Sequence, residues 1–465
     1  MNDLGEKISA REYALKLLYK VEKENKYSNI IRDELFKEDN LSESDRSFFN
    51  QLFFGVLSRK LTIDAIISKK SKIKPNKISP WINNALRIGI YQIIFLNRIP
   101  VSAACSESVK LAKKYGHSAS ASFVNAILRN LVRDIQAVKE EGLDNEELVT
   151  KILDFSDCSK VEKVSLLYSH PEWIVEKWFE QLGEEFTEKL CEANNKIPLT
   201  TIRVNINKAS RQQLQDLLKQ KGIDCEFTKY SNQGIILTKG NPINEFYNEG
   251  LYTVQDEAAM LVSEILQPKA GEVIADVCSA PGGKTTHIAE LMGNKGKIYA
   301  FDIHPHRVNL VAKAAKRLGI NIIEPIEHDA TQIIDSLIGK CDRVLVDAPC
   351  SGLGVIRRKP EIKWTRNKEN IIELISIQNR IFSTCSQYVK PGGRLVYSTC
   401  TINSEENEAV IKEFLDNNKD FNVDIEAIEK FCILNNSSKK KSVAFYPNVH
   451  NTDGFFIAVL KRIKD

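Results

Sequence analysis

The stretch VIADVCSAPGGKTTHIAELM, residues 273–292, decides the fold of the second half of the chain. Its first residues form a short apolar run typical of a buried strand, which passes through a glycine turn into a segment with helical spacing of apolar residues. Strand and helix patterns then alternate through KIYAFDI, RVNLVAKAAKRLG, DRVLVDA and GRLVYSTC. This alternation predicts a doubly wound α/β domain whose ligands bind beyond the carboxyl ends of its parallel strands.

The glycine turn marks the first of these strand ends. Its residues are Cys278, Ser279, Ala280, Pro281, Gly282, Gly283 and Lys284. Glycine lets a ligand approach the backbone, and the N–H groups at the start of the following helix favour an anionic or carboxylate-bearing cofactor. The turn matches neither GxGxxG nor the phosphate loop GxxxxGK[ST], and such a turn alone is often only structural.

Aspartates follow the next three strands, at Asp302, Asp329 and Asp347. A carboxylate at a strand end can accept hydrogen bonds from ribose hydroxyls. One such aspartate is unremarkable. Three of them after a glycine loop favour a cofactor that carries a nucleoside.

Two cysteines end the last two strands. The strand DRVLVDA leads into Cys350, and the strand GRLVYST leads into Cys400, so we expect both thiols to face the cleft. A thiolate is a strong nucleophile, and two thiols beside a cofactor cleft indicate covalent catalysis with a second group assisting. The alternative is that both are small buried residues, which is the commonest role of a free cysteine.

Composition limits the remaining possibilities. The chain has 465 residues, 27% charged and 43% hydrophobic, which is typical of a globular protein of about two to four domains. Its ten cysteines are irregularly spaced without a CxxC pair, so neither a disulfide scaffold nor a metal site is expected. The N-terminus lacks a signal pattern and no apolar run is long enough to span a bilayer, so we expect a cytoplasmic protein without membrane association.

The front of the chain is basic and helical. Residues 1–139 contain 24 Lys and Arg against 14 Asp and Glu. Apolar residues recur there at spacings of three and four, which predicts a small all-helical domain over residues 1–140. We expect a linker and a small α+β module over residues 141–245, and the α/β domain over residues 246–465. Five lysines crowd one short stretch, either to hold a polyanion or as a solvated loop: Lys69, Lys70, Lys72, Lys74 and Lys77.

Together these motifs resemble the Sun-type RNA 5-methylcytosine methyltransferases, which use S-adenosylmethionine. The matching segments are Asp276–Lys284, Asp347–Gly352 and Ser398–Thr401, supported by Arg203–Asn205, Val254–Ala258, Arg357–Pro360 and Asp453–Phe456. The helical front domain resembles the NusB antitermination fold. The whole arrangement is similar to the RsmB family of bacterial 16S rRNA methyltransferases, and the resemblance covers nearly the full chain.

The resemblance implies roles for the strand-end residues. Cys400 would be the nucleophile, Cys350 would assist product release, and Asp347 with Lys284 would complete the catalytic set. Residues 278–284, Asp302, Asp329 and Asp347 would bind S-adenosylmethionine. The substrate would be carbon 5 of a cytosine in 16S rRNA, at the family's usual position 967. Free rRNA and an assembling subunit both remain open as substrates, and no obligatory protein partner is implied.

The expected chemistry agrees with these roles. Carbon 5 of cytosine is a poor nucleophile, and addition of a thiolate to carbon 6 creates an enamine-like ring that can take a methyl group. A cytosine inside a helix cannot present both faces, so the target must be unpaired or extruded. Arg357, Arg358, Lys359 and Arg203 are the expected RNA contacts, whereas Trp364 is equally suited to stacking on a base or to packing.

Two other functions fit parts of the sequence. In a DNA cytosine methyltransferase the Pro-Cys cysteine, here Cys350, would itself be the nucleophile, although the additional Thr-Cys motif at Cys400 argues against that function. In a different class, the basic helical domain would make the chain an RNA-binding antitermination or ribosome-assembly factor. The intact catalytic motifs favour the RNA methyltransferase over both.

Overall fold

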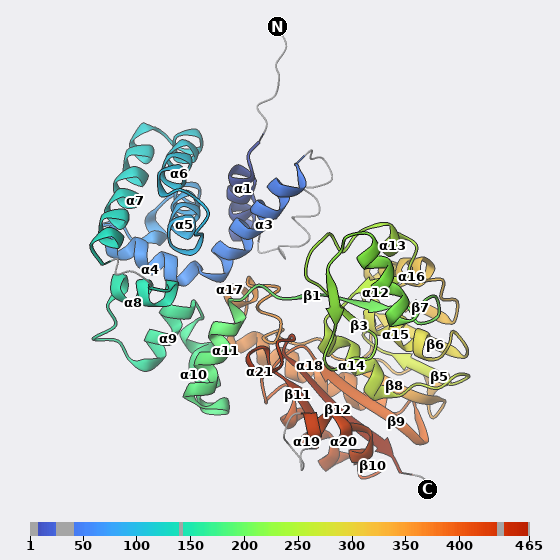
Figure 1. Cartoon of the computed structure of the whole chain (residues 1–465). Helices are drawn as coiled ribbons and strands as arrows, with labels where there is room; N and C mark the ends of the chain where they lie inside the picture. The colour runs from blue at the N-terminus through green and yellow to red at the C-terminus, as the bar shows by residue number, and fades with distance from the viewer. Residues whose placement is uncertain (1–7, 25–40, 139–142, 435–440, 464–465) are drawn as a thin grey trace. The chain divides into compact units, whose positions relative to one another are not determined.

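The computed structural model describes residues 8–24, 41–138, 143–434 and 441–463. The chain divides into two compact units (Figure 1). The first comprises Met1–Lys196 with Lys359–Thr365, and the second comprises Ile197–Arg358 with Arg366–Asp465. The predicted fold classes, helical at the front and α/β at the back, are confirmed.

The first unit is helical throughout its described residues. Its α-helices are α1 (Ala10–Glu24), α3 (Glu43–Ser58), α4 (Lys60–Lys70), α5 (Pro80–Phe95), α6 (Val101–Tyr115), α7 (Ser118–Val138), α8 (Asn145–Leu153), α9 (Lys160–Tyr168), α10 (Glu172–Leu182), α11 (Glu184–Asn194) and α17 (Ile362–Thr365). Helix α5 is the centre of the packing, because α1, α3, α4, α6 and α7 all contact it. Its fully buried Leu86, Ile88 and Ile90 explain why this stretch is hydrophobic on nearly every face.

The boundary between the units lies at Lys196, beyond the predicted boundary near residue 140. Helices α8 and α9 both pack on α4, where they bury Val149 and Val164. The acidic stretch over residues 134–157 was compatible with either a surface helix or a hinge; part of it forms α8, and the apolar faces of α8 and α9 contribute to the core of the first unit.

A small antiparallel sheet opens the second unit. Its strand order is β2-β3-β1-β4, and its elements are β1 (Thr200–Val204), α12 (Arg211–Gln220), β2 (Cys225–Phe227), β3 (Gly234–Leu237), α13 (Glu245–Asn248) and β4 (Tyr252–Val254). Helix α12 buries Leu214 and Leu218 against Ile202 and Ile235 of the sheet. The predicted α+β module therefore exists.

The large sheet of the second unit has the strand order β10-β12-β9-β8-β5-β6-β7, with β11 beside β12. Its elements are α14 (Glu257–Leu266), β5 (Val273–Asp276), α15 (Gly283–Leu291), β6 (Lys297–Asp302), α16 (Pro305–Leu318), β7 (Ile323–Glu327), β8 (Cys341–Asp347), α18 (Lys368–Ser386), β9 (Val389–Thr399), α19 (Glu408–Asn417), β10 (Phe421–Val423), α20 (Ile425–Leu434), β11 (Val443–Phe445), α21 (Pro447–His450) and β12 (Phe455–Arg462). Strands β5 to β9 are parallel, as predicted, whereas β10, β11 and β12 add an antiparallel edge.

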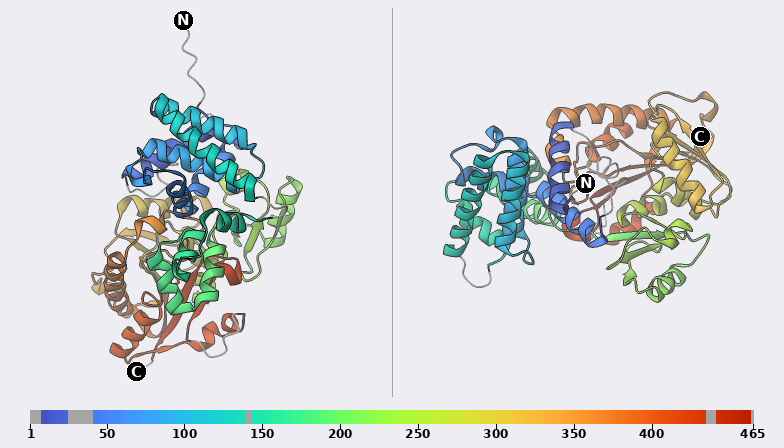
Figure 2. Two further views of the ribbon diagram at one scale, coloured as in Figure 1. Left: turned by 90° about the vertical axis from the view of Figure 1, so that its left-hand side faces the viewer. Right: turned by 90° about the horizontal axis from the view of Figure 1, so that it is seen from above.

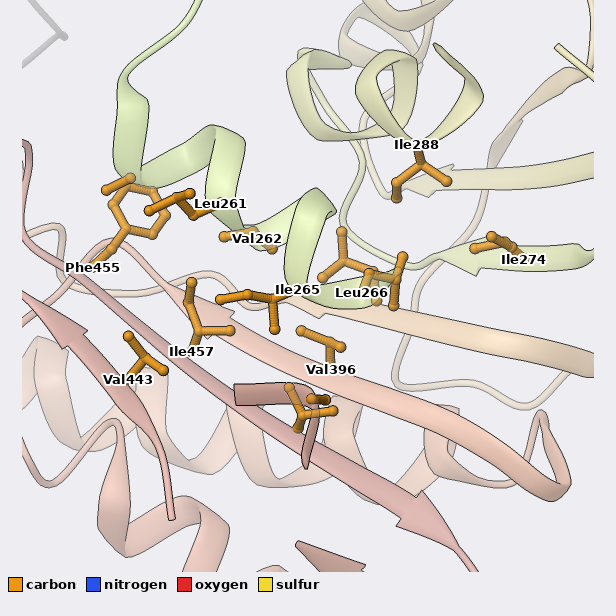
Figure 3. Packing of buried hydrophobic residues seen from close by; sticks show 14 of the residues in the cluster. Leu261, Val262, Ile265, Leu266, Ile274, Ile288, Val396, Val443, Phe455 and Ile457 are labelled. Carbon is orange, nitrogen blue, oxygen red and sulfur yellow. The ribbon is translucent and has the colours of Figure 1, made fainter. Parts of the chain in front are cut away.

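Helices cover both faces of this sheet, as the views in Figure 2 also show. On one face, Leu261 and Ile265 of α14 pack against Val396 of β9 and Ile457 of β12 (Figure 3). On the other face, α18 and α19 bury Phe382 and Phe414. Burial of each such side chain stabilises the fold by about 1.5–3 kcal/mol. The strands that carry the site are therefore held in a well-packed layer.

The strand order reverses between β5 and β8. From β5 the chain proceeds outward through β6 and β7, and it returns to the other side of β5 for β8 and β9. Loops at the carboxyl ends of β5 and β8 therefore run to opposite sides, and such a switch point is where open α/β sheets bind their ligands.

Candidate active site

The two strand-end cysteines lie side by side. Strands β8 and β9 run parallel with Asp347 opposite Ser398, so the chain leaves both strands at the same edge of the sheet. Cys350 and Cys400 follow these ends, and their Sγ atoms are 3.2 Å apart. Both residues are half-buried. The structure thus brings together the two thiols that the sequence predicted to face the cleft.

The proton of Cys350 is held firmly. The sulfur contact with Cys400 raises the pKa of Cys350 well above its ordinary value, and burial raises it further. Cys350 therefore stays a thiol near neutral pH.

The main chain packs closely behind Cys400. The N–H of Gly354 donates to the carbonyl oxygen of Cys400 at 3.0 Å, and the N–H of Gly454 donates to the carbonyl of Gly354 at 2.7 Å. A Cβ atom on Gly454 would lie only 2.7 Å from Cα of Gly354. The Asp453–Phe456 motif therefore supplies a glycine that the loop after Cys350 needs.

An ion pair lies beside the thiols. Lys284, in the first turn of α15, donates from Nζ to Oδ2 of Asp347 at 2.7 Å, and the Ser398 hydroxyl donates to Oδ1 at 2.7 Å. Burial acts to lower the pKa of Lys284, but the ion pair with Asp347 outweighs it and raises this pKa above its ordinary value. The two donors fix the carboxylate, and each oxygen keeps a lone pair for a further donor.

The glycine turn forms a close cradle at the end of β5. Gly282 has a φ of +101°, and a Cβ atom there would lie 3.2 Å from Cα of Val311. Beneath the turn, Asp276 accepts a 2.7 Å hydrogen bond from the Thr285 hydroxyl at Oδ2. Its buried Oδ1 has no partner among the described residues, and burial raises the pKa of Asp276 to about 7. The turn therefore combines an approachable backbone with a buried polar group.

Two more predicted aspartates follow the neighbouring strands. Asp302, at the end of β6, accepts from the N–H of His304 at 3.1 Å and lies 3.3 Å from Nη1 of Arg307. Asp329 follows β7, and it accepts from the N–H and the hydroxyl of Thr331 at 2.9 and 2.8 Å. The main-chain hydrogen bond lowers the pKa of Asp329. Since β6 and β7 are parallel to β5, these carboxylates lie at the same edge of the sheet as the glycine turn.

Two of the predicted RNA contacts are corrected, because protein encloses them. Arg203 is fully buried, and its guanidinium donates to the Glu290 carboxylate at 2.8 and 3.0 Å and to the Gly283 carbonyl at 2.6 Å. The side chain of Arg357 is 1% exposed and donates to the Asn451 carbonyl at 2.8 Å. Their donors are occupied by the protein, so neither guanidinium can reach a phosphate.

The other two predicted RNA contacts differ from each other. Arg358 is 29% exposed, yet it pairs with Asp453 at 2.6 Å and with Asp256 at 2.7 Å. Burial raises the pKa of Asp453 to about 6, although the nearby charges of Arg358 and Arg357 act to lower it. Lys359 is exposed. Lys359 is thus the predicted contact with the most accessible charge.

The aromatic residues of the first unit serve packing. Trp178 is fully buried in α10, and His170 is fully buried with Nδ1 2.8 Å from the Tyr168 carbonyl oxygen. The indole of Trp364 donates to the Leu57 carbonyl at 2.9 Å. Of the two uses expected for Trp364, the structure therefore favours packing.

Glu406 belongs to the site but was not predicted. This fully buried carboxylate accepts from the N–H of Ser351 at 2.8 Å and from the side chains of Thr401 and Asn403, each at 3.2 Å. It thereby joins the segments that carry the two cysteines. The sequence SEEN at residues 404–407 holds no signal that separates Glu406 from its exposed neighbour Glu405.

The described residues offer neither a metal-binding cluster nor a membrane-spanning helix. Residues 8–24, 41–138, 143–434 and 441–463 contain no cluster of three His, Cys, Asp or Glu suited to a metal ion. Over the same ranges, no helix has the length and apolar character required to cross a membrane.

Comparison with protein families gives three matches along the chain. Residues 263–461 match the model of the 16S rRNA methyltransferases RsmB/F. Residues 8–133 match the NusB family, and residues 170–244 match a ferredoxin-like domain of RsmF/B-like methyltransferases. The three matches follow the order of the helical unit, the small sheet and the large sheet.

Individual proteins and solved structures match either nearly the whole chain or about two thirds of it. The "Probable ribosomal RNA small subunit methyltransferase B" of Bacillus subtilis is 37% identical over 98% of this chain and 99% of its own length. The crystal structure of PH0851 covers 98% of this chain and 99% of its own, with a TM-score of 0.77 and 28% identity. The structure of NSun6 from Pyrococcus horikoshii with SFG covers 64% of this chain and all of its own, with a TM-score of 0.57 and 25% identity.

Proposed function

Because the chain belongs to the RsmB/F family of 16S rRNA methyltransferases, we propose that it methylates carbon 5 of a cytosine in 16S rRNA through a covalent adduct with Cys400. S-adenosylmethionine is the methyl donor of this family. The observation that carries the proposal is the pair of thiols 3.2 Å apart, one at each of two parallel strand ends. Methyl transfer to a nitrogen or to a ribose oxygen needs no cysteine, whereas attack on carbon 6 of cytosine needs a thiol, and a second thiol beside it can assist release.

The residues around the glycine turn suit the cofactor. Gly282 lets a ligand approach the main chain, Asp276 offers a buried acceptor, and the strand-end carboxylates suit ribose hydroxyls. Residues 278–284 with Asp302, Asp329 and Asp347 would hold S-adenosylmethionine. When bound, it supplies an electrophilic methyl group on a sulfonium.

The chain's own residues activate the base. The Cys400 sulfur forms a bond to carbon 6, which opens the double bond between carbons 5 and 6 and makes carbon 5 nucleophilic. Asp347 accepts a hydrogen bond from the 4-amino group of the base, and the Lys284 ammonium beside it offsets the negative charge that thiolate addition develops in the ring. Uracil carries a carbonyl at the same position, so this carboxylate selects cytosine. Lys284 and Ser398 keep Asp347 oriented for this contact.

Release of the product reverses the addition. A base takes the proton from carbon 5, the double bond re-forms, and the bond between carbon 6 and the Cys400 sulfur breaks with the electron pair returning to sulfur. Cys350, which holds its proton 3.2 Å away, assists this departure by donating a hydrogen bond to the leaving thiolate.

The target must reach the thiols unstacked. Position 967 of 16S rRNA is the expected target, and extrusion or an unpaired loop would give Cys400 access to its carbon 6. Lys359 is exposed on the segment that follows the Cys350 turn, where it suits a phosphate of the bound strand.

The experiment that tests the proposal compares Cys350→Ala with Cys400→Ala. Each variant is incubated with 16S rRNA and S-adenosylmethionine and run on a denaturing gel. We expect Cys350→Ala to accumulate a covalent band of protein and RNA, because addition proceeds but release is slow. We expect Cys400→Ala to give neither band nor methylated product.

The opposite pattern would contradict the assigned roles. If Cys400→Ala accumulated the adduct and Cys350→Ala gave none, Cys350 would be the nucleophile, as in DNA cytosine methyltransferases. If the wild-type protein methylated no cytosine of 16S rRNA, the proposed reaction itself would fail.

A further inference from the structure

We propose that Glu406 is a positioning residue that clamps the two cysteine segments together, so that both thiols act on one substrate base. The Cys350 segment is defined here as residues 348–352 and the Cys400 segment as residues 400–403. The role of the thiols on cytosine rests on the proposed function, whereas the clamp consists of contacts within the protein.

One carboxylate oxygen holds the Cys350 segment. Oε1 of Glu406 accepts from the N–H of Ser351 at 2.8 Å and from the side-chain amide of Gln378 at 3.2 Å. The same amide group of Gln378 donates to the carbonyl of Pro349 at 2.9 Å. The residues on either side of Cys350 are thereby fixed through Glu406 and its neighbour Gln378.

The other oxygen holds both segments at once. Oε2 accepts from the Ser351 hydroxyl at 2.5 Å, from the Thr401 hydroxyl at 3.2 Å and from the Asn403 amide at 3.2 Å. The hydroxyl oxygens of Ser351 and Thr401 are 2.9 Å apart. Ser351 and Thr401 directly follow the two cysteines, so this oxygen sets the separation of the two chains next to the sulfur atoms.

The chemistry of the cluster requires a carboxylate. Five donors converge on Glu406, and an ionised carboxylate accepts at both oxygens without presenting a donor of its own. A buried carboxylate is costly to desolvate unless such donors surround it. The main chain of Glu406 is held as well, because the Tyr397 hydroxyl donates a hydrogen bond to the Glu406 carbonyl oxygen at 2.7 Å. A glutamine would turn an NH₂ group toward one set of donors and force the two segments apart.

The thiols themselves report the separation. Diamide oxidises two neighbouring thiols to a disulfide and is itself reduced to the hydrazine, taking up the two hydrogens and two electrons. The rate at which the Cys350–Cys400 disulfide forms, followed by peptide mass spectrometry, depends on how often the sulfur atoms meet. This readout needs neither RNA nor cofactor.

The test compares Glu406→Gln with Glu405→Gln in the full chain. Glu405 is the exposed neighbour, so its variant removes the same charge outside the cluster. We expect the disulfide rate of Glu406→Gln to fall about 10-fold below wild type, and that of Glu405→Gln to match wild type. In urea, where the segments are no longer held, all three rates should coincide. With rRNA, we expect kcat to fall about 10-fold or more while KM for S-adenosylmethionine is unchanged.

An unchanged native disulfide rate in Glu406→Gln would overturn the proposal, even if methyl transfer were lost. If Glu406→Gln does not fold, the disulfide rate of Ser351→Ala tests the clamp instead, since this variant removes only the hydroxyl that lies between Glu406 and Thr401. A wild-type disulfide rate in Ser351→Ala would then overturn the clamp, and a reduced rate would support it. Failure of the wild-type protein to methylate rRNA would defeat the proposed function and leave this comparison intact.

Discussion

Asp276 is a buried carboxyl group that makes the free energy of unfolding depend on pH. Burial raises its pKa to about 7 in the folded protein, whereas an unfolded chain has an aspartate pKa of about 3.9. The folded state therefore keeps a proton that the unfolded state has lost. The stability contributed by this proton is fully present below about pH 4 and is lost as the pH rises through about 7.

We expect Asp276→Asn to remove this dependence. Relative to wild type, the variant should gain unfolding free energy with rising pH, by at most about 1.4 kcal/mol per pH unit between about pH 4 and 7. Urea unfolding at several pH values measures the difference, with Asp335→Asn, an exposed aspartate, as the control. Parallel curves for wild type and Asp276→Asn would show that Asp276 holds no proton in the folded protein.

We expect substitutions at Asp347 and at its hydrogen-bond partner Ser398 to slow methyl transfer to different degrees. Replacement by asparagine removes the carboxylate that receives the Lys284 ion pair and the proposed hydrogen bond from the base. We expect single-turnover methyl transfer to slow by roughly 100- to 1,000-fold. Ser398→Ala removes only one supporting hydrogen bond, so a loss of about 10-fold or less is expected. Equal losses in the two variants would contradict a direct contact between Asp347 and the base.

Single residues also show what sequence reasoning can reach. Cys350 and Cys400 were predictable because a residue that follows a parallel strand must lie at the carboxyl edge of the sheet. Glu406 and Arg203 were not, because the partners that bury them, Ser351 for Glu406 and Glu290 for Arg203, are distant in the chain. A charged residue is expected to be exposed, unless the residue that pairs with it in the folded protein is known.

At the scale of elements, a buried ion pair ties the small sheet to the glycine turn. Arg203 of β1 pairs with Glu290 of α15, and both side chains are fully buried. We expect Arg203→Met to lower the free energy of unfolding by about 3–5 kcal/mol, because it leaves Glu290 buried and unpaired. The double variant Arg203→Met, Glu290→Leu should recover much of that loss. Guanidinium unfolding measures all three proteins, and a double variant as unstable as the single one would contradict this interpretation.

The elements themselves were predictable to different degrees. The parallel strands β5, β6, β8 and β9 were predicted because each is a short apolar run followed by a turn signal. The antiparallel edge of β10, β11 and β12 was not, because β12 pairs with β9 across the 55 residues of chain, 400–454, that separate the two strands. Short strands at a sheet edge are specified by their partner more than by their own pattern.

At the scale of the whole molecule, a short piece of the later chain completes the first unit. Residues 359–365 belong to it, and there the Lys363 amine donates to the Ser58 carbonyl at 2.7 Å. Lys363 is nearly fully buried, and burial lowers its pKa well below the ordinary value. The main chain enters this segment from the second unit after Arg358 and returns to that unit at Arg366. The helical unit is therefore not complete as residues 1–196 alone.

The same unit presents a basic cavity of about 770 Å³ whose lining includes Lys72 and Lys74. Lys69 and Lys70, from the same lysine-rich stretch, are engaged by the protein, since Lys69 donates to the Leu153 carbonyl and Lys70 pairs with Asp134. We therefore expect exposed Lys72 and Lys74 to carry phosphate contacts with rRNA. Each lost contact should lower the slope of log affinity against log salt by about 0.7–0.9.

The double variant Lys72→Gln, Lys74→Gln should accordingly show a salt slope roughly 1.5 lower than wild type in filter binding to 16S rRNA at several salt concentrations. The double variant Lys69→Gln, Lys70→Gln removes the same total charge from the same stretch, so it is the matched control. Because its lysines are turned toward protein carbonyl and carboxylate groups, its slope should stay close to wild type. Equal slopes in the two double variants would mean that net charge alone attracts the RNA, and that the cavity makes no phosphate contacts.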